Sequence, residues 1–290
     1  MHRLNKYILV AILSLAFSYL PSISLAKPLP VFVSIAPQKY FVERIGGSEV
    51  DVEVMVKTGE SPSTFNPNPK KMSRLTNAKL YFSIGVPFEK VWISRIKAIQ
   101  PDLKFIPLNK NLPTHLESEH SHSGNHSHEE GDPHIWTSPP LAKKMAAEIE
   151  TALSTEMPDK ADFFKTNFQA LANDLDVLDQ EIRLILEAGK SYSFMVFHPA
   201  WSYFAETYGL EQISIEHEGK EPGPRALQEI ISRGKDLNIK VIFVQKQFGL
   251  SMAQKVAKMI GATVREMDPL SEDYLENMRQ TAKAISGANN

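Results

Sequence analysis

The sequence predicts an α/β protein of two lobes, each with a parallel-type sheet flanked by helices, joined by one long rigid helix. Short apolar runs of strand length alternate with amphipathic helical segments in residues 27–157 and again in residues 190–290. Such alternation is typical of a mainly parallel sheet. Between the two regions, residues 158–189 carry one unbroken helical pattern. We therefore expect a signal peptide over residues 1–26, then an N-terminal lobe, a linking helix and a C-terminal lobe with these bounds.

The linking helix is predicted from a stripe of apolar side chains at alternating steps of four and three residues. These are Phe164, Phe168, Leu171, Leu175, Leu178, Ile182 and Ile185, and their spacing keeps them on one helical face. Pro158 and Asp159 mark the start and Gly189 marks the end, so the helix is roughly 45 Å long at 1.5 Å per residue. A long surface helix or a coiled-coil seam would show the same stripe, but flanking lobes of comparable size favour a connector.

The first 26 residues have the pattern of an export signal. Arg3 and Lys6 precede an apolar run at residues 7–20, and small residues at positions 24–26 suit a signal peptidase. We expect cleavage after Ala26. The apolar run has 14 residues, fewer than the roughly 20 that span a bilayer. The sequence therefore favours a soluble protein in the bacterial periplasm over one held by a membrane anchor.

Charge and cysteine content exclude several classes of function. Loss of Arg3 and Lys6 leaves 30 basic against 34 acidic residues, a net charge of −4, and this mild acidity argues against nucleic acid as a partner. The chain has no cysteine, which excludes disulfides, thiolate metal sites, cysteine catalysis and a lipid-modified cysteine. A metal would therefore be held by His, Asp, Glu or hydroxyl groups. We expect a monomer.

The elements of the N-terminal lobe follow in order from residue 31. We expect strands at residues 31–35, 50–56, 80–84 and 105–108, with helices at residues 37–45, near 72–75 and at 88–99. A loop rich in turn residues, 59–69, follows the second strand. In parallel sheets ligands bind beyond the carboxyl ends of the strands, and this loop occupies that position.

Residues 109–131 interrupt the pattern with a histidine-rich stretch. It contains His115, His120, His122, His126 and His128, a composition typical of metal binding. Imidazoles on such a loop would hold zinc, nickel or copper weakly and in several ways, because ordering the loop costs entropy. We expect an auxiliary metal-collecting loop, although a solvated loop with accidental histidines would have the same composition.

His134 differs from these loop histidines because its surroundings are rigid. Pro133 fixes the backbone before it and Trp136 supplies apolar bulk beside it. These neighbours indicate an oriented ligand, whereas the alternative is a core histidine with satisfied hydrogen bonds. An amphipathic helix at residues 141–153 then leads to the linking helix.

Two candidate ligands follow strands of the C-terminal lobe. His198 directly follows the expected strand at 192–197, and Asp268 follows the last one at 263–267. The other elements expected are strands at 212–215 and 241–244 and helices at 201–208, 226–235, 251–260 and 271–286. Asp268 thus lies at a strand end like His198, although an Asp-Pro turn or helix cap would also explain it.

Several segments together are similar to one protein family. They are GDPHIW at 131–136, FHPAWSYFAETYGL at 197–210, EGKEPGP at 218–224, Asp268-Pro269-Leu270 and the histidine-rich loop. In this order they resemble the periplasmic zinc-binding and manganese-binding proteins of metal ABC importers, the ZnuA-like and TroA-like family. The resemblance covers nearly the whole mature chain. It implies two α/β lobes joined by a long helix with the metal between them, and the importer's membrane permease as partner.

The resemblance also implies the metal ligands. Three positions match the family's ligands, namely His134, His198 and Asp268. The family's remaining ligand is a histidine in the loop after the second strand, and Ser63 stands at that position here. A hydroxyl is a much weaker zinc ligand than an imidazole. Three alternatives follow. The zinc would have three protein ligands plus a water molecule, Glu60 would supply the fourth ligand, or the site would bind zinc less tightly.

His198 favours zinc as the transported ion. Family members that take up manganese resemble one another in having a carboxylate at this position, whereas imidazole suits Zn2+. Manganese or another divalent metal, including copper or nickel, remains the alternative. The sequence thus predicts a high-affinity zinc-binding protein for an ABC importer.

Two further classes share some of these features. Two histidines, one aspartate and an open position also describe a catalytic zinc site. A hydrolase would need a general base, for which Glu60, Glu216, Glu218 and Glu221 are the candidates, and the chain has no H-E-x-x-H helix. A periplasmic zinc chaperone or adhesin without a transporter is the other reading. We expect a binding protein and not an enzyme.

Overall fold

A computed structural model describes residues 27–110, 112, 131–189, 192–217 and 219–288. The expected signal peptide lies outside the described residues, and so do the five histidines of the histidine-rich loop.

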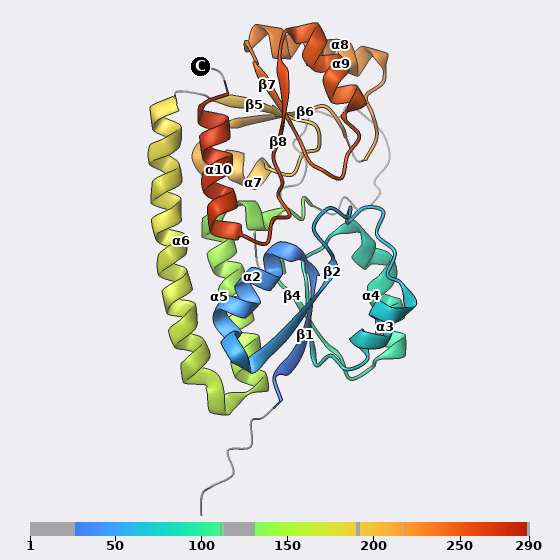
Figure 1. The fold of residues 1–290 in the computed structure, drawn as a ribbon, viewed down its shortest axis with the longest axis vertical. Coiled ribbons are helices and arrows are strands. Elements are labelled where there is room, and N and C mark those ends of the chain that lie inside the picture. The colour runs from blue at the N-terminus through green and yellow to red at the C-terminus, as the bar shows by residue number, and fades with distance from the viewer. Residues whose placement is uncertain (1–26, 111, 113–130, 190–191, 218, 289–290) are drawn as a thin grey trace, which may run out of the picture.

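The first sheet is parallel and has the order β2-β1-β3-β4. Its strands are β1 (Leu29–Ile35), β2 (Val50–Val56), β3 (Leu80–Ser83) and β4 (Lys104–Pro107). Helix α2 (Ala36–Gly46) covers one face, and α3 (Pro69–Leu75) and α4 (Pro87–Ile99) lie on the other (Figure 1). The central strands β1 and β3 are mainly apolar and buried, because both of their faces are covered.

The second sheet repeats this plan with the order β6-β5-β7-β8. Its strands are β5 (Ser193–Val196), β6 (Glu211–Ser214), β7 (Val241–Val244) and β8 (Thr263–Glu266). The helices of this lobe are α7 (Ser202–Tyr208), α8 (Pro224–Asp236), α9 (Leu250–Ile260) and α10 (Tyr274–Ser286). The chain order reverses between β5 and β7, the position at which open α/β sheets bind ligands. The predicted pair of parallel sheets is confirmed.

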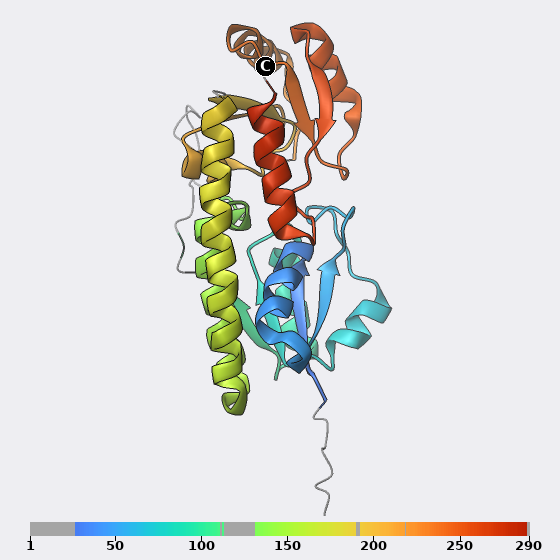
Figure 2. The same ribbon diagram turned by 60° about the vertical axis from the view of Figure 1, so that its left-hand side comes forward.

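The predicted long helix is also confirmed as α6 (Ala161–Gly189), which follows α5 (Pro139–Glu156) and a 3₁₀ turn at Pro158–Lys160. Figure 2 shows α6 running alongside both lobes, beside α5 at one end and α10 at the other. Its buried face ends on Leu186, whereas Ile185 is only half-buried. A straight α-helix drifts by about 20° per heptad, so the buried stripe moves by one residue over the length of this helix.

One large hydrophobic core extends through both lobes. It includes Phe32 of the first sheet, Leu171 of α6, Phe243 of the second sheet, and the side chains of Trp136 and Tyr274 between them. A smaller core, with Met195 and Val256 among its members, lies between the second sheet and the α8–α9 pair. The two lobes therefore pack against one another through buried apolar contacts.

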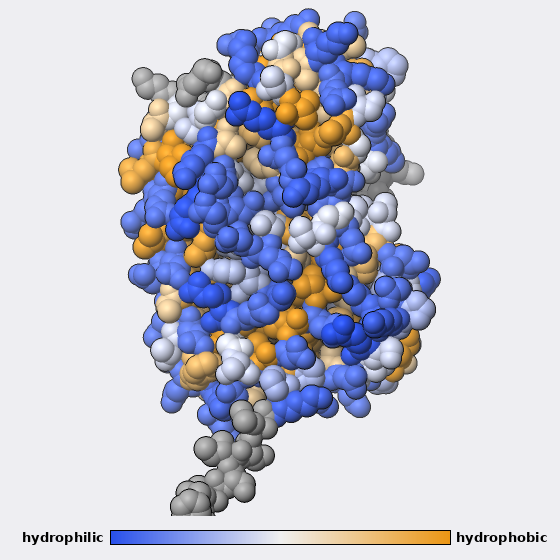
Figure 3. Space-filling view, in the orientation of Figure 1, coloured by the Kyte–Doolittle hydropathy of each residue, from blue (hydrophilic) through white to orange (hydrophobic). Residues whose placement is uncertain are grey.

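The face of the molecule in Figure 3 is mostly hydrophilic, and its apolar residues form separate areas. Among the described helices, none has both the length and the apolar composition to cross a membrane.

Candidate metal centre

His134 is held by the residue two positions before it. Its backbone N–H donates to Asp132 Oδ1 at 2.9 Å, and its ring Nδ1 lies 2.5 Å from the same oxygen. The Trp136 ring packs beside it, with 5.2 Å between ring centroids. When Nδ1–H donates to a carboxylate, Nε2 carries the lone pair that binds a metal. The loop thus fixes both the orientation and the tautomer expected of a zinc ligand.

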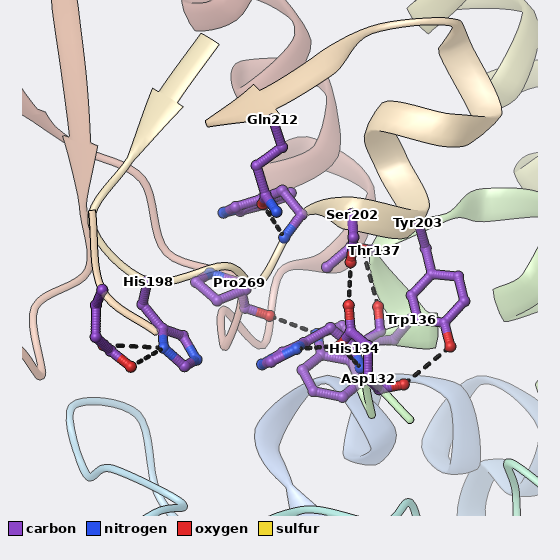
Figure 4. A network of polar contacts seen from close by, with 11 residues as sticks. Asp132, His134, Trp136, Thr137, His198, Ser202, Tyr203, Gln212 and Pro269 are labelled. Carbon is purple, nitrogen blue, oxygen red and sulfur yellow. Dashed lines mark hydrogen bonds and ion pairs between the residues drawn. The ribbon is translucent and has the colours of Figure 1, made fainter. Parts of the chain in front are cut away.

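Asp132 also contacts the other lobe. Its Oδ2 accepts a hydrogen bond from the hydroxyl of Ser202, and its backbone carbonyl accepts one from Tyr203 OH at 2.9 Å (Figure 4). Burial acts to raise the pKa of the Asp132 carboxyl, but the electrostatic attraction of the neighbouring His134 ring and the hydrogen bonds from His134 and Ser202 outweigh it and hold the pKa below its ordinary value. The carboxylate is therefore ionised where it faces the imidazole.

His198 lies in the same kind of environment. It follows β5, and its Nδ1 lies 3.1 and 3.2 Å from the two carboxylate oxygens of Glu216. Glu216 follows β6, is only 3% exposed, and also accepts the backbone N–H of Gly219 at 2.5 Å. The Phe248 ring stacks on the imidazole at 4.9 Å with an interplanar angle of 25°. His198 is thus fixed through Nδ1 and one ring face.

The two imidazoles come from different lobes and lie against one another. Their ring centroids are 5.4 Å apart and their planes cross at 75°. Because each ring has a carboxylate on Nδ1, the two Nε2 atoms are the nitrogens left for a ligand. Imidazole suits zinc, copper and nickel, whereas magnesium, calcium and manganese prefer oxygen ligands. The pair therefore fits a borderline metal ion such as zinc.

Asp268 follows β8 as the sequence predicts, and it makes a turn. Its Oδ1 accepts the backbone N–H of Leu270 at 2.9 Å, and its carbonyl accepts from Asn277 Nδ2 at 2.8 Å. Trp136 Nε1 donates to the neighbouring Pro269 carbonyl at 2.8 Å, which ties this turn to the His134 segment. Within the part of the chain that the structure describes, no three His, Asp or Glu side chains are grouped closely enough to hold an ion. Asp268 therefore does not join the histidine pair in this conformation.

Ser63 is exposed in the loop after β2. Its backbone N–H donates to Ser61 Oγ at 3.3 Å, and the carbonyl of Pro62 beside it accepts from Phe88 N at 3.2 Å. Glu60, considered above as a substitute ligand, is exposed and accepts the backbone N–H of Lys57 at 2.9 Å. In this structure Glu60 thus stabilises the turn that carries Ser63.

Asp132 and Glu216 were not predicted from the sequence as partners of the two histidines. Asp132 was detectable, because an acidic residue two positions before a histidine in a rigid turn can reach its ring. Glu216 entered only as a candidate base, and its pairing with His198 depends on β6 lying next to β5. That strand order is not encoded in any local pattern.

The sequence and the fold match known proteins. Residues 31–288 match the family model ZnuA, described as zinc-uptake complex component A, periplasmic. A crystal structure of ZnuA superposes with a TM-score of 0.83 at 36% identity, covering 91% of this chain and all of the other. A 138–173 deletion mutant of ZnuA with zinc bound gives the same TM-score and identity, covering 91% of this chain and 98% of that one.

A relative of known name supports the same family. The zinc-binding lipoprotein AdcA of Streptococcus pneumoniae serotype 4 is 26% identical over an alignment of 280 residues, which covers 89% of this chain and 55% of AdcA. The chain thus spans about half the length of this relative.

Proposed function

We propose that this chain, which belongs to the ZnuA family of periplasmic zinc-uptake components, captures zinc between its lobes and delivers it to the membrane permease of an ABC importer. One observation of the structure carries the proposal. His134 and His198 come from different lobes, lie 5.4 Å apart between ring centroids, and each has a carboxylate on Nδ1. Such carboxylate–histidine pairs are the usual support of zinc-binding imidazoles.

We infer the remaining ligands from the chemistry of the segments around this pair. Asp268 supplies a third ligand when its turn moves toward the histidines, since its Oδ1 bonds to Leu270 in the present conformation. Ser63 or a water molecule takes the fourth position of a tetrahedral shell. Two imidazoles and one carboxylate favour zinc over manganese, which prefers oxygen ligands.

The family is one of binding components and not of enzymes. Glu216, one of the candidate bases, bonds to His198 Nδ1 and to the backbone of Gly219. Glu216 therefore orients a metal ligand, and these contacts do not support the role of a general base in a hydrolase. The AdcA relative bears the name of a zinc-binding lipoprotein, which supports zinc as the cargo.

We further propose the finer points of location and assembly. The periplasmic family description supports export of the chain, with cleavage after Ala26. The mature protein would act as a monomer, with lobes at residues 27–157 and 190–290 and the linking helix at 158–189. The histidine-rich loop, 109–131, would serve as an auxiliary zinc collector.

Competition titration with a zinc chelator tests the site. His134→Ala and His198→Ala should each weaken zinc binding by at least about a hundredfold, because each removes one of the strong nitrogen ligands from a shell of four. His217→Ala is the matched control, since His217 directly follows Glu216 in the chain and its side chain is exposed. Unchanged zinc affinity in both ligand variants would refute the assignment.

A growth assay tests delivery. A bacterium lacking its own periplasmic zinc-binding component should recover growth under zinc limitation when it carries this chain together with its permease. Recovery with the His198→Ala variant at equal expression would contradict delivery from this site.

A further inference from the structure

We propose that Ser202 and Tyr203, at the start of α7 in the C-terminal lobe, are positioning residues for zinc binding by His134 of the N-terminal lobe. They act through Asp132, which they hold and which in turn holds the imidazole. This inference rests on the proposed function, since it concerns how the same zinc ligand is oriented.

Each oxygen of Asp132 has its own hydrogen-bond partner. Oδ1 faces His134 N and Nδ1, Oδ2 accepts from Ser202 Oγ, and the backbone carbonyl accepts from Tyr203 OH (Figure 4). The Asp132 side chain is 11% exposed and that of His134 15%. A carboxylate bonded at both oxygens and at its own carbonyl has little freedom to rotate, so the imidazole that it holds is fixed with it.

The partners of Asp132 come from the segment that carries the other histidine ligand. Ser202 and Tyr203 begin α7 only four and five residues after His198. One short segment of the C-terminal lobe therefore supplies one imidazole and fixes the orientation of the opposite one. The spacing between the two rings is set by protein contacts before any ion arrives. Preorganisation of this kind lowers the entropy lost on binding.

The structure offers a matched control for a merely structural role. Another side-chain hydrogen bond between the lobes joins Ser138 Oγ to Thr207 Oγ1 at 2.8 Å. Ser138 lies at the start of α5, and Thr207 lies within α7. This hydrogen bond joins the same α7 to the segment just after His134, but it does not involve the Asp132 carboxylate. Ser138→Ala and Ser202→Ala thus each remove one hydroxyl from the same interface, and only the second removes a partner of Asp132.

The test compares Ser202→Ala, Tyr203→Phe, Ser202→Thr and Ser138→Ala in the full mature chain. Zinc affinity is measured by chelator competition, the zinc dissociation rate by stopped flow, Co2+ coordination by its visible absorption bands, and thermal stability by calorimetry. We expect Ser202→Ala and Tyr203→Phe to weaken zinc by about tenfold, the lower end of the range for outer-shell partners, chiefly through faster dissociation. We also expect altered Co2+ bands in both. Ser202→Thr keeps the hydroxyl and should restore wild-type affinity.

Ser138→Ala should lower the melting temperature, as Ser202→Ala does, while leaving zinc affinity and the Co2+ bands unchanged. Equal loss of zinc affinity in Ser138→Ala and Ser202→Ala would overturn the inference, because lobe contact in general would then be responsible. So would wild-type zinc binding and Co2+ bands in Ser202→Ala and Tyr203→Phe. Failure of the wild-type chain to bind zinc tightly would instead refute the proposed function itself.

Discussion

Ser63→Ala and Ser63→His test the departure of this chain from its family most sharply. Ser63 stands where the resemblance implies a histidine ligand, and its side chain is exposed in the loop after β2. Its hydroxyl is a weak zinc ligand, so Ser63→Ala should change zinc affinity by less than about threefold, within roughly 0.6 kcal/mol. Ser63→His should tighten zinc binding, because a neutral imidazole would replace water in the tetrahedral shell.

The loop around Ser63 is already fixed, which limits the cost of adding a ligand there. Thr64 N donates to Ser61 O at 3.2 Å, and the Phe65 ring packs against Phe88 with 5.2 Å between centroids. Ordering one imidazole on this backbone then costs about 1 kcal/mol of side-chain entropy. A net gain of tenfold needs only about 1.4 kcal/mol, so we expect at least that increase in affinity.

Competition against a high-affinity zinc chelator measures both variants, with Thr64→His as the control. Thr64 lines a surface pocket of about 490 Å³ on this loop together with Glu60 and Lys71, and Ser63 is not part of that lining. A histidine at position 64 should therefore leave zinc affinity unchanged. If Ser63→Ala abolishes binding, or Ser63→His weakens it, the loop supplies its ligand in another way and the assignment of the fourth position is wrong.

Three further predictions concern the rest of the chain. Glu216→Ala should weaken zinc binding by about 10- to 100-fold in the same titration, because His198 loses the partner on Nδ1, and unchanged affinity would refute this orienting role. Leu175 is 1% exposed in α6, so Leu175→Ala should lower the free energy of unfolding, measured in urea, by about 2–5 kcal/mol. Leu184 is 67% exposed on the same helix, and Leu184→Ala should change this free energy by less than about 0.5 kcal/mol. Equal effects of the two substitutions would contradict the packing argument. Deleting residues 114–130 should leave one tight zinc in calorimetry and reduce the number of weakly bound ions, whereas loss of the tight site would show that the deleted histidines are primary ligands.

The long helix was predictable because its apolar stripe is a local pattern. The steps from Phe164 to Ile182 have helical spacing whatever the tertiary structure, and those two residues are fully buried in α6. The end of the stripe was not predictable to the residue, since Leu186 rather than Ile185 is buried there. The buried face depends on helical drift and on the packing of α10, which no single segment of sequence specifies.

The candidate site was predictable only in part. His134 and His198 could be chosen from the rigid turn and the strand end in which they lie, but their approach to 5.4 Å between ring centroids depends on how the two lobes pack. The contact of Glu216 with His198 depends on strand order in the second sheet. The position of Asp268 after its strand was predicted correctly. The hydrogen bond from Leu270 N to its carboxylate was not, because the Asp-Pro pattern fits both a metal ligand and a turn.

Zinc X-ray absorption of the mature chain without residues 114–130, loaded with one equivalent of zinc, shows directly which atoms bind the ion. We expect about four nearest neighbours around the zinc, with two imidazoles at roughly 2.0–2.1 Å and the remaining ligands oxygen. His134→Ala and His198→Ala should each remove one imidazole from the spectrum. A shell of six oxygens, or imidazole scattering that persists in both variants, would contradict a zinc site shared between the two lobes.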